Sequence, residues 1–382
     1  MGYKILAIYG NQVYYGHERS NMQVFNTLTT EGYEFVVLVN KKGIAKQAKQ
    51  VLDQKEIAYS QISYPDWTDM RKPFTIIKTL RYLGKVVKHN VEFLKQHKKV
   101  KPDYIYIAND FMYINLIPAL LLINTKVVYR LGDAPVVQWK PFKFLWRNYI
   151  VKRTHKFVCI SKYIHNKLIE AGRSKESNDI VIYNFPPERI EKILKPIDFI
   201  KKGLVFSYLG QIIKIKGVSE FIDAAIAICE KHNDVYFLLA GSLEYDKDFS
   251  QLQINKVKNN NLQDRIIFLG NIENIKDFFK KTDVLVTPSI KEEPLGNVLV
   301  EAKENSTPSI IFNSGGMPEL IDHEVNGYIC KNKTAFELEK AIEYYINIPE
   351  VIKKHGTEAK RSISKLGIGE GMYKENWLSV FK

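Results

Sequence analysis

Two glutamates flank a glycine turn near residue 296 of this 382-residue chain, and their chemistry is complementary to that of the turn. Glu293 precedes the turn, and Glu301 follows it on the second turn of a helix that the sequence predicts after Gly296. The first backbone N–H groups of a helix point outward at the positive end of its dipole, which favours a phosphate or diphosphate. Carboxylates accept hydrogen bonds from hydroxyl groups such as those of sugars. The stretch therefore predicts a site for a ligand that carries both groups.

The neighbouring segments are those needed to position such a site. Residues 283–287 form an apolar run, which predicts a buried parallel strand, and Pro288-Ser289 end it in a loop. A second loop, Gly315-Gly316-Met317-Pro318-Glu319, follows the next predicted strand. In doubly wound α/β sheets, ligands bind at the carboxyl ends of the strands, where both loops are expected.

The run Glu293-Pro-Leu-Gly-x4-Glu301, with the Gly-Gly-x-Pro-Glu loop after it, resembles the donor-site signature of the retaining glycosyltransferases of family 4, which have the GT-B fold. The resemblance implies that Glu301 holds the ribose of a sugar nucleotide and that Glu293 contacts the transferred sugar. It also places donor-binding groups in the loop and the helix start: Leu295, Gly296, Asn297 and Val298. The alternative is a pair of solvated glutamates beside a helix start.

Two more loops in this half of the chain carry expected donor contacts. After a strand over residues 204–209, the loop 210–217 begins at Gly210 and, in the family, offers an arginine and a lysine to the diphosphate. Lys216 matches the lysine, whereas Gln211 replaces the arginine, so Lys214 is expected to supply the second charge. Asn271 and Ile272, after a strand over residues 265–269, resemble the family's base-reading loop.

The first half begins with a strand over residues 3–9, a polar loop over residues 10–21 and a helix from about Met22. The resemblance makes Gly16 a donor contact, with His17, Glu18 and Arg19 as further candidates, although the family's usual glycine pair is missing. Asp133 follows a strand over residues 126–130, where family members carry a His or Asp close to the reacting sugar. Gly132 replaces the common histidine, and a plain structural turn is the alternative reading of Gly132-Asp133.

The length suits two α/β domains, and the resemblance implies a GT-B arrangement of two Rossmann-like doubly wound domains facing across a cleft. We expect an acceptor and membrane-side domain over residues 1–185, a linker over 186–203 and a sugar-nucleotide domain over 204–367. Residues 368–382 are expected to form a helix that crosses back to the first domain.

A formal net charge of +14 favours an anionic partner. Residues 71–101 hold ten Lys or Arg and one acid, Glu92, with apolar residues at steps of three and four: Ile76, Leu80, Leu83, Val87, Val91 and Leu94. This amphipathic helix is expected either to attract anionic lipid headgroups or to pack on the core with a solvated basic face. Residues 139–153 interleave aromatics with cations, which suits a membrane edge, nucleic-acid bases or partial core packing.

Several site classes are not expected. No run of roughly 18 apolar residues exists to cross a bilayer, and the start of the chain does not resemble a signal peptide, so we expect a cytoplasmic protein, peripheral on the inner face of the cell membrane. Cys159, Cys229 and Cys330 lack metal-ligand spacing and are expected in the core. Asp246-Lys247-Asp248 is expected in a solvated loop, and neither a metal nor another cofactor is expected.

The resemblance implies a retaining, metal-independent hexosyltransferase-type enzyme. Its expected acceptor is a lipid-linked saccharide in cell-surface polysaccharide or glycolipid synthesis. Lys214, Lys216 and the Gly296 helix start would stabilise the diphosphate leaving group, while Glu293 and Asp133 fit as stabilisers or bases and no nucleophile is assigned. The alternatives are a soluble acceptor, a sugar-nucleotide epimerase of the same fold and a basic nucleic-acid-binding protein.

Overall fold

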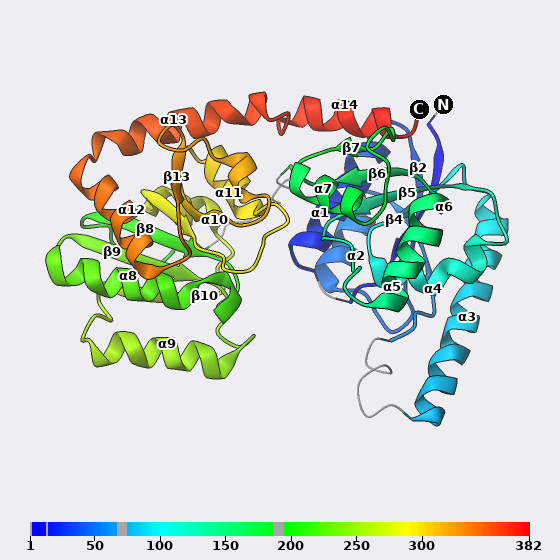
Figure 1. The fold of residues 1–382 in the computed structure, drawn as a ribbon, viewed down its shortest axis with the longest axis horizontal. Coiled ribbons are helices and arrows are strands. Elements are labelled where there is room, and N and C mark those ends of the chain that lie inside the picture. Colours follow the sequence, from blue (N-terminus) through cyan, green and yellow to red (C-terminus); the bar gives the residue numbers. More distant parts are fainter. Residues whose placement is uncertain (1, 13, 67–74, 186–194) are drawn as a thin grey trace. The chain divides into compact units, whose positions relative to one another are not determined.

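The computed structural model describes residues 2–12, 14–66, 75–185 and 195–382. The chain divides into two compact units (Figure 1): unit 1 comprises Met1–Glu188 with Glu370–Lys382, and unit 2 comprises Arg189–Gly369. Residues 186–194 of the expected linker lie outside the described residues. Each unit has its own parallel sheet and its own hydrophobic core.

Unit 1 is built on a seven-stranded parallel sheet of order β3-β2-β1-β4-β5-β6-β7. Its strands are β1 (Lys4–Tyr9), β2 (Glu34–Asn40), β3 (Ala58–Ile62), β4 (Tyr104–Ile107), β5 (Lys126–Leu131), β6 (Thr154–Cys159) and β7 (Ile180–Val181). Its helices are α1 (Gly16–Thr29), α2 (Lys46–Gln54), α3 (Ile76–Val100), α4 (Asp110–Leu120), α5 (Lys140–Leu145), α6 (Val151–Arg153), α7 (Lys162–Glu170) and α14 (Glu370–Val380). The central strand β1 is buried on both faces, as its unbroken apolar run predicts.

Unit 2 is built on a six-stranded parallel sheet of order β10-β9-β8-β11-β12-β13. Its strands are β8 (Leu204–Leu209), β9 (Val235–Ala240), β10 (Ile266–Gly270), β11 (Val284–Thr287), β12 (Ser309–Phe312) and β13 (Gly327–Cys330). Its helices are α8 (Val218–Lys231), α9 (Lys247–Asn259), α10 (Ile275–Lys281), α11 (Asn297–Glu304), α12 (Ala335–Asn347) and α13 (Glu350–Lys365). The predicted pair of doubly wound parallel sheets is thus confirmed.

The C-terminal helix α14 is part of unit 1. Tyr373, Trp377 and Phe381 are buried in the same hydrophobic cluster as residues of β1 and α1. The Tyr104 hydroxyl of β4 donates a hydrogen bond to the carbonyl of Phe381 at 3.3 Å. The last residues of the chain therefore complete the core that its first strand begins.

Three local predictions differ from the structure. Helix α1 begins at Gly16 rather than near Met22, because the Glu18 carboxylate accepts a hydrogen bond from the backbone N–H of Tyr15 at 3.0 Å and caps the helix start. Strand β3 was not predicted. Asp246 lies in the expected exposed turn, where its side chain accepts a hydrogen bond from Phe249 N at 3.2 Å and caps α9, but Lys247 and Asp248 are exposed in the first turn of that helix rather than in a loop.

The aromatic-cationic segment of residues 139–153 divides between core and surface. Trp146 is fully buried and stacks on Tyr129 and Phe157, so this part of the segment is core. Trp139 and Phe144 are 68% and 66% exposed. Among the described large aromatics of the segment, Trp139 and Phe144 are the exposed ones, whereas Phe142 and Tyr149 are half-buried.

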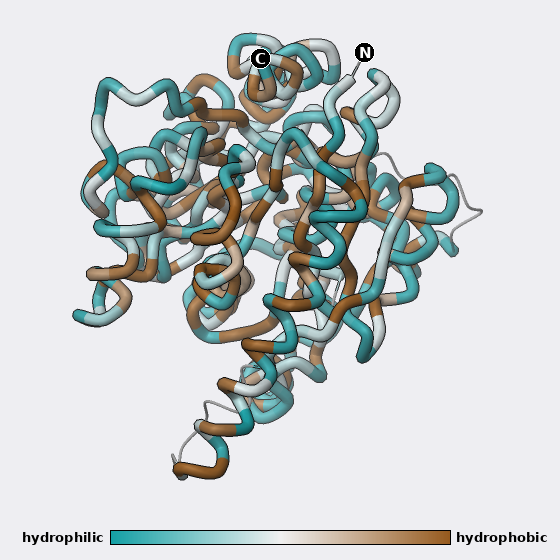
Figure 2. The backbone as a smooth tube through the Cα atoms, turned by 90° about the vertical axis from the view of Figure 1, so that its right-hand side faces the viewer, coloured by the Kyte–Doolittle hydropathy of each residue, from teal (hydrophilic) through white to brown (hydrophobic). Residues whose placement is uncertain are grey.

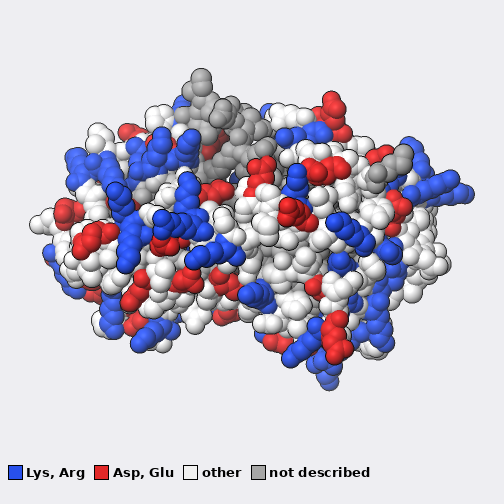
Figure 3. Space-filling model, turned by 90° about the horizontal axis from the view of Figure 1, so that it is seen from above, with Lys and Arg blue, Asp and Glu red and all other residues white. Residues whose placement is uncertain are grey.

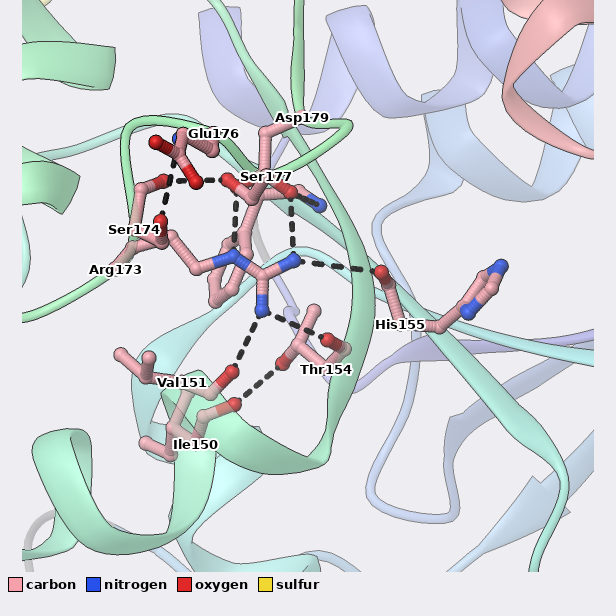
Figure 4. A network of polar contacts seen from close by, with 10 residues as sticks. Ile150, Val151, Thr154, His155, Arg173, Ser174, Glu176, Ser177 and Asp179 are labelled. Carbon is pink, nitrogen blue, oxygen red and sulfur yellow. Dashed lines mark hydrogen bonds and ion pairs between the residues drawn. The ribbon is translucent and has the colours of Figure 1, made fainter.

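A buried ion pair braces the end of this segment (Figure 4). Arg173 donates to both carboxylate oxygens of Asp179 at 2.7 and 2.9 Å, and to the carbonyls of Val151 and Thr154 at 2.8 and 3.2 Å. The Asp179 side chain is fully buried. The pair joins the loop after α7 to the start of β6, and both charges have bidentate or carbonyl partners, as buried ions require.

The surface carries both signs of charge, with Lys and Arg in the majority on the face that Figure 3 shows. The three cysteines are buried and unpaired, as predicted. Within the described ranges, no helix has the length and apolar character needed to cross a bilayer.

Candidate functional site

Three loops of unit 2 meet at the carboxyl edge of its sheet. The N–H groups of Ile290 and Lys291, after β11, donate to the carbonyl of Ile215, after β8, at 3.0 and 3.1 Å. The N–H of Gly316, after β12, donates to the carbonyl of Glu293 at 2.7 Å. The loops that follow three different strands are thereby held together at the carboxyl edge of the sheet. Ligands bind at this edge in doubly wound sheets.

Two glycines allow this close approach. Gly217 has φ +73°, and a Cβ atom there would lie 1.8 Å from the carbonyl oxygen of Pro288. Gly315 has φ +58°, and a Cβ atom there would lie 2.0 Å from the carbonyl oxygen of Glu293. Any side chain at either position would push the loops apart, so both the backbone conformation and the space require glycine.

The predicted residues Lys216 and Glu293 form an ion pair between Nζ and Oε1. The same carboxylate oxygen accepts a hydrogen bond from Ser289 Oγ at 2.6 Å. The lysine and glutamate side chains are 30% and 15% exposed, so the pair is largely shielded from water but still reachable. A diphosphate that recruits Lys216 has to compete with Glu293 for it.

Helix α11 begins as predicted. Gly296 is its N-cap with φ +89°, and no side chain caps the helix start. Asn297 and Val298 in the first turn and Glu301 in the second are partly exposed. The side chain of Leu295 is buried, so this predicted donor contact can reach a ligand only through its backbone.

The remaining donor residues of unit 2 are spread along the same edge. Lys214 is exposed, whereas the carbonyl of Gln211 accepts a hydrogen bond from the Tyr208 hydroxyl at 2.7 Å, which fixes the loop next to Gly210. Asn271 and Ile272 follow the edge strand β10, and strands β9 and β8 separate them from β11. The structure therefore brings Lys216 and Glu293 into contact. Asn271 and Ile272 lie farther along the edge of the sheet.

In unit 1, the predicted residues lie at the carboxyl edge of the seven-stranded sheet. Gly16 is the first residue of α1 and is exposed, and Asp133 is exposed in the loop after β5. Glu18, a further candidate, is 5% exposed and caps α1 while accepting a hydrogen bond from Asn11 Nδ2 at 2.5 Å. Its role in the structure is to hold the helix start.

Asp110 is a chemically active group that the sequence reasoning missed. It lies at the start of α4, after β4, and accepts hydrogen bonds from the Tyr129 hydroxyl and from Val136 N, the latter at 3.3 Å. Burial, reinforced by the charge of Asp133, raises the pKa of Asp110 to about 7. A signal for it exists in the sequence, because Asp110 is a polar residue just after the apolar run of residues 104–108.

No three His, Cys, Asp or Glu side chains within residues 2–12, 14–66, 75–185 and 195–382 are grouped as a metal site requires.

Known glycosyltransferases resemble this chain in sequence and in fold. Residues 189–362 match the family described as glycosyl transferases group 1. An uncharacterized glycosyltransferase of Haemophilus influenzae is 23% identical over 380 residues, 96% of each chain.

Two solved structures share the fold over the whole chain. A glycosyltransferase from Rickettsia africae has a TM-score of 0.82 and 18% identity, covering 100% of this chain and 98% of its own. Anabaena HepE in complex with UDP and glucose has a TM-score of 0.76 and 20% identity, covering 99% of this chain and 98% of its own. The chain therefore has the GT-B fold of glycosyltransferases, to which it is homologous, and carries a glycosyl transferases group 1 domain over residues 189–362.

Proposed function

We propose that the chain is a retaining glycosyltransferase of family 4 that moves a sugar from a nucleoside-diphosphate sugar to an acceptor without a metal ion. The observation that carries the donor assignment is the meeting of Lys216, Glu293 and the start of α11 at one edge of unit 2. A cation, a helix N-terminus and a carboxylate match a diphosphate and its adjoining sugar. The UDP in the HepE complex makes uridine nucleotides the first to test.

In this proposal each residue acts on a different part of the donor. Glu301 accepts hydrogen bonds from the ribose, and Glu293 from the transferred sugar. Cleavage of the sugar–phosphate bond places negative charge on the diphosphate, which Lys216, Lys214 and the first amides of α11 stabilise. Asp133 of unit 1 serves the reacting sugar or the acceptor hydroxyl.

The test is a transfer assay with product analysis by NMR. Sugar nucleotides are first screened by thermal shift, and the nucleotide that binds is incubated with saccharide and lipid-linked acceptors. The proposal predicts release of nucleoside diphosphate and a new glycosidic bond with the anomeric configuration of the donor. An inverted product contradicts retention, and an isomerised sugar nucleotide without transfer establishes the epimerase alternative. Salt-sensitive binding of RNA or DNA without sugar-nucleotide binding establishes the nucleic-acid alternative.

The acceptor proposal rests on helix α3 of unit 1. Six large apolar residues along its first two thirds are between 46% and 80% exposed: Ile76, Ile77, Leu80, Leu83, Val87 and Val91. Figure 1 shows the N-terminal end of α3 extending away from the sheet of unit 1, and Figure 2 shows hydrophobic residues along this extension. The core-facing interpretation of this stripe is therefore wrong.

A different face of α3 packs on the unit. His89, Asn90 and Phe93 are buried, and Tyr82 donates a hydrogen bond from its hydroxyl to Asn115 Oδ1 at 2.6 Å. At 100° per residue, the exposed apolar stripe lies beside this packed face, and a basic flank follows on its other side. The basic flank consists of Lys78, Arg81, Lys85 and Lys88. Arg71, where the basic run of the sequence starts, lies outside the described residues.

An apolar stripe with a basic flank matches the surface of an anionic bilayer. The aliphatic side chains can enter the acyl boundary while the cations remain at the phosphates. Each cation near such a surface contributes on the order of 1 kcal/mol. We therefore propose that unit 1 docks on the cytoplasmic face of an anionic membrane and receives a lipid-linked saccharide, in cell-surface polysaccharide or glycolipid synthesis.

Co-sedimentation with liposomes tests the docking surface. The wild type is expected to bind vesicles that contain anionic lipid and to bind neutral vesicles less. Neutralising Lys78, Arg81, Lys85 and Lys88 together is expected to weaken binding at least tenfold. The matched control removes four cations of α13 instead, Lys353, Lys354, Lys360 and Arg361, and is expected to bind as the wild type does. Equal binding by both variants would make a soluble acceptor the better proposal.

The apolar stripe has its own test. Replacing Leu80, Leu83 and Val87 by Ser should reduce vesicle binding even at low salt, because the aliphatic contribution does not depend on ionic strength. Leu252→Ser on α9, where the leucine is 62% exposed, is the control. Sedimentation equilibrium without lipid gives the competing outcome: a stable dimer that the triple variant abolishes would assign the stripe to a second copy of the chain.

A further inference from the structure

Arg130 is a buried cation in unit 1 that has no acidic partner among the residues the structure describes. It lies near the carboxyl end of β5 and is 2% exposed. Its Nη1 and Nη2 donate to the amide oxygens of Asn21 and Asn184 at 3.2 and 2.6 Å. It forms no ion pair with any described residue, in contrast to Arg173, whose carboxylate partner is Asp179. Burying a charge with only neutral partners costs several kcal/mol. A bound group of opposite charge would offset this cost for Arg130.

The imidazole of His17 lies next to this guanidinium, over Gly132. A Cβ atom at residue 132 would lie 2.9 Å from His17 Nδ1 and 3.7 Å from Arg130 Nη1. Gly132 does not have a positive φ, so glycine is required there for space and not for backbone conformation. The missing side chain leaves room for the ring, and residue 132 beside it is partly exposed.

The ring of His17 is neutral in this setting. Desolvation, together with the positive charge of Arg130, lowers the pKa of His17 to about 4 in spite of its hydrogen bond with the backbone of Ala108. On its own helix, Glu18 is engaged in capping, and Arg19 follows it. From the loop after β5, Asp133 is the nearest acid in sequence to Gly132. The charged group next to Gly132 is thus the guanidinium, beside a neutral ring whose single N–H is engaged with the backbone of Ala108.

We propose that Arg130, His17 and Gly132 form a subsite for an anionic group, a phosphate or diphosphate, of the acceptor. The proposal rests on the proposed function, in which unit 1 receives the acceptor, and adds that the acceptor is negatively charged. The anion supplies the counter-charge that no described residue offers to Arg130, and the guanidinium donates a charge-assisted hydrogen bond to it. The phosphate of a lipid-linked saccharide and that of a soluble sugar phosphate share this chemistry.

The test is the pKa of His17 measured by NMR, which requires neither activity nor a known acceptor. An anion bound beside Arg130 offsets its positive field, so saturating inorganic phosphate should raise the pKa of His17 by about one unit relative to sodium chloride of equal ionic strength. Geranyl diphosphate is the lipid-like probe. Tighter binding of geranyl diphosphate assigns the subsite to a lipid-linked acceptor, and equal or tighter binding of phosphate assigns it to a soluble one. His17→Gln identifies the resonance among the eight histidines.

Variants separate an anion site from a structural clamp. Arg130→Gln should abolish the response to anions, and Arg130→Lys should retain part of it. If Arg130→Gln does not fold, Gly132→Ala serves, because its methyl group displaces the ring and should weaken phosphate binding at least tenfold. Gly84→Ala is the control, since a Cβ there contacts nothing within 4 Å.

The experiment is performed in the Lys216→Ala background as well, which removes the proposed diphosphate contact of unit 2. A His17 pKa that neither anion moves overturns the subsite while leaving sugar-nucleotide binding untouched. A response that persists in Arg130→Gln overturns it too. A response to phosphate in a protein that binds no sugar nucleotide would refute the donor proposal but keep the subsite.

Discussion

Replacing Glu293 by Gln should strengthen the binding of free UDP while impairing transfer. In the structure, the carboxylate of Glu293 holds the ammonium group of Lys216, which a diphosphate needs. Glutamine keeps the shape of the side chain and can still accept the hydrogen bond from Ser289, but it releases the lysine. Free UDP lacks the transferred sugar that Glu293 is proposed to contact, so titration with UDP measures only the effect of releasing Lys216.

The magnitude follows from the burial of the pair. Fully exposed ion pairs contribute about 0.2–1 kcal/mol, and hydrogen bonds to charged groups about 1.5–3 kcal/mol. With the lysine 30% and the glutamate 15% exposed, about 1 kcal/mol is a reasonable value. That corresponds to roughly a fivefold lower Kd for UDP in Glu293→Gln.

The assay is isothermal titration calorimetry with UDP. The matched control is Glu292→Gln, which removes the same charge one residue away but releases Lys333, whose Nζ lies 2.9 Å from the Glu292 carboxylate. The control should change the Kd less than twofold. If Glu293→Gln binds UDP no more tightly than wild type, or if both variants gain equally, Glu293 does not withhold Lys216 from the diphosphate.

Three further predictions concern the same unit. Lys216→Ala should lower turnover at least about tenfold in steady-state kinetics, because the lysine offers charge to the diphosphate. Gln211→Ala should have a smaller effect, and Lys214→Ala a comparable or intermediate one. An unchanged rate for Lys216→Ala would remove this residue from the site. EDTA should leave transfer intact, and loss of activity with rescue by Mg²⁺ would overturn the metal-free proposal. Lys303 is 1% exposed, and burial lowers its pKa from 10.5 to about 8. Between these two pH values the unfolded chain therefore binds more protons than the folded one. The free energy of unfolding should rise with pH across that window. Lys303→Met should abolish this rise and increase Tm at pH 7; denaturant titrations that give equal slopes for both proteins would contradict the assignment.

The unit 2 elements that present the donor loops could be predicted because their signals are local. Strand β11 is a continuous apolar run, and Gly296 supplies the positive φ at which helix α11 begins. The ion pair between Lys216 and Glu293 could not be derived from local pattern, because it joins residues 77 positions apart. It depends on loops that contact each other only when the sheet has formed.

The orientation of α3 shows where periodicity fails. The apolar stripe was visible in the sequence, but the helix packs through a neighbouring, more polar face. Asn90 Oδ1 accepts a hydrogen bond from Ala119 N at 2.8 Å, and His89 Nδ1 lies 2.7 Å from the carbonyl oxygen of Ser63. These contacts pair Asn90 and one ring nitrogen of His89 inside unit 1, so polar residues of this helix are buried and the usual link between polar and exposed does not hold here.

The two polar groups of unit 1 proposed to bind an anion were hidden for a related reason. Arg130 occurs in an otherwise apolar strand, and nothing in its neighbours along the chain shows that it is buried without an acid. Its neighbour His17 lies on α1, far from β5 in the sequence. The need for glycine at residue 132 can be recognised only from the structure, in which the His17 ring occupies the space of a side chain there.

The proposed donor site requires that unit 2 bind a nucleoside diphosphate through Glu301 and the start of α11. A thermal-shift screen of UDP, GDP, ADP, CDP and TDP tests it without knowledge of the sugar or the acceptor. We predict that at least one nucleotide raises the Tm of the wild type and that Glu301→Ala abolishes the rise, because the ribose loses its carboxylate partner. If no nucleotide shifts the Tm, or if Glu301→Ala responds as the wild type does, the proposed donor site is contradicted.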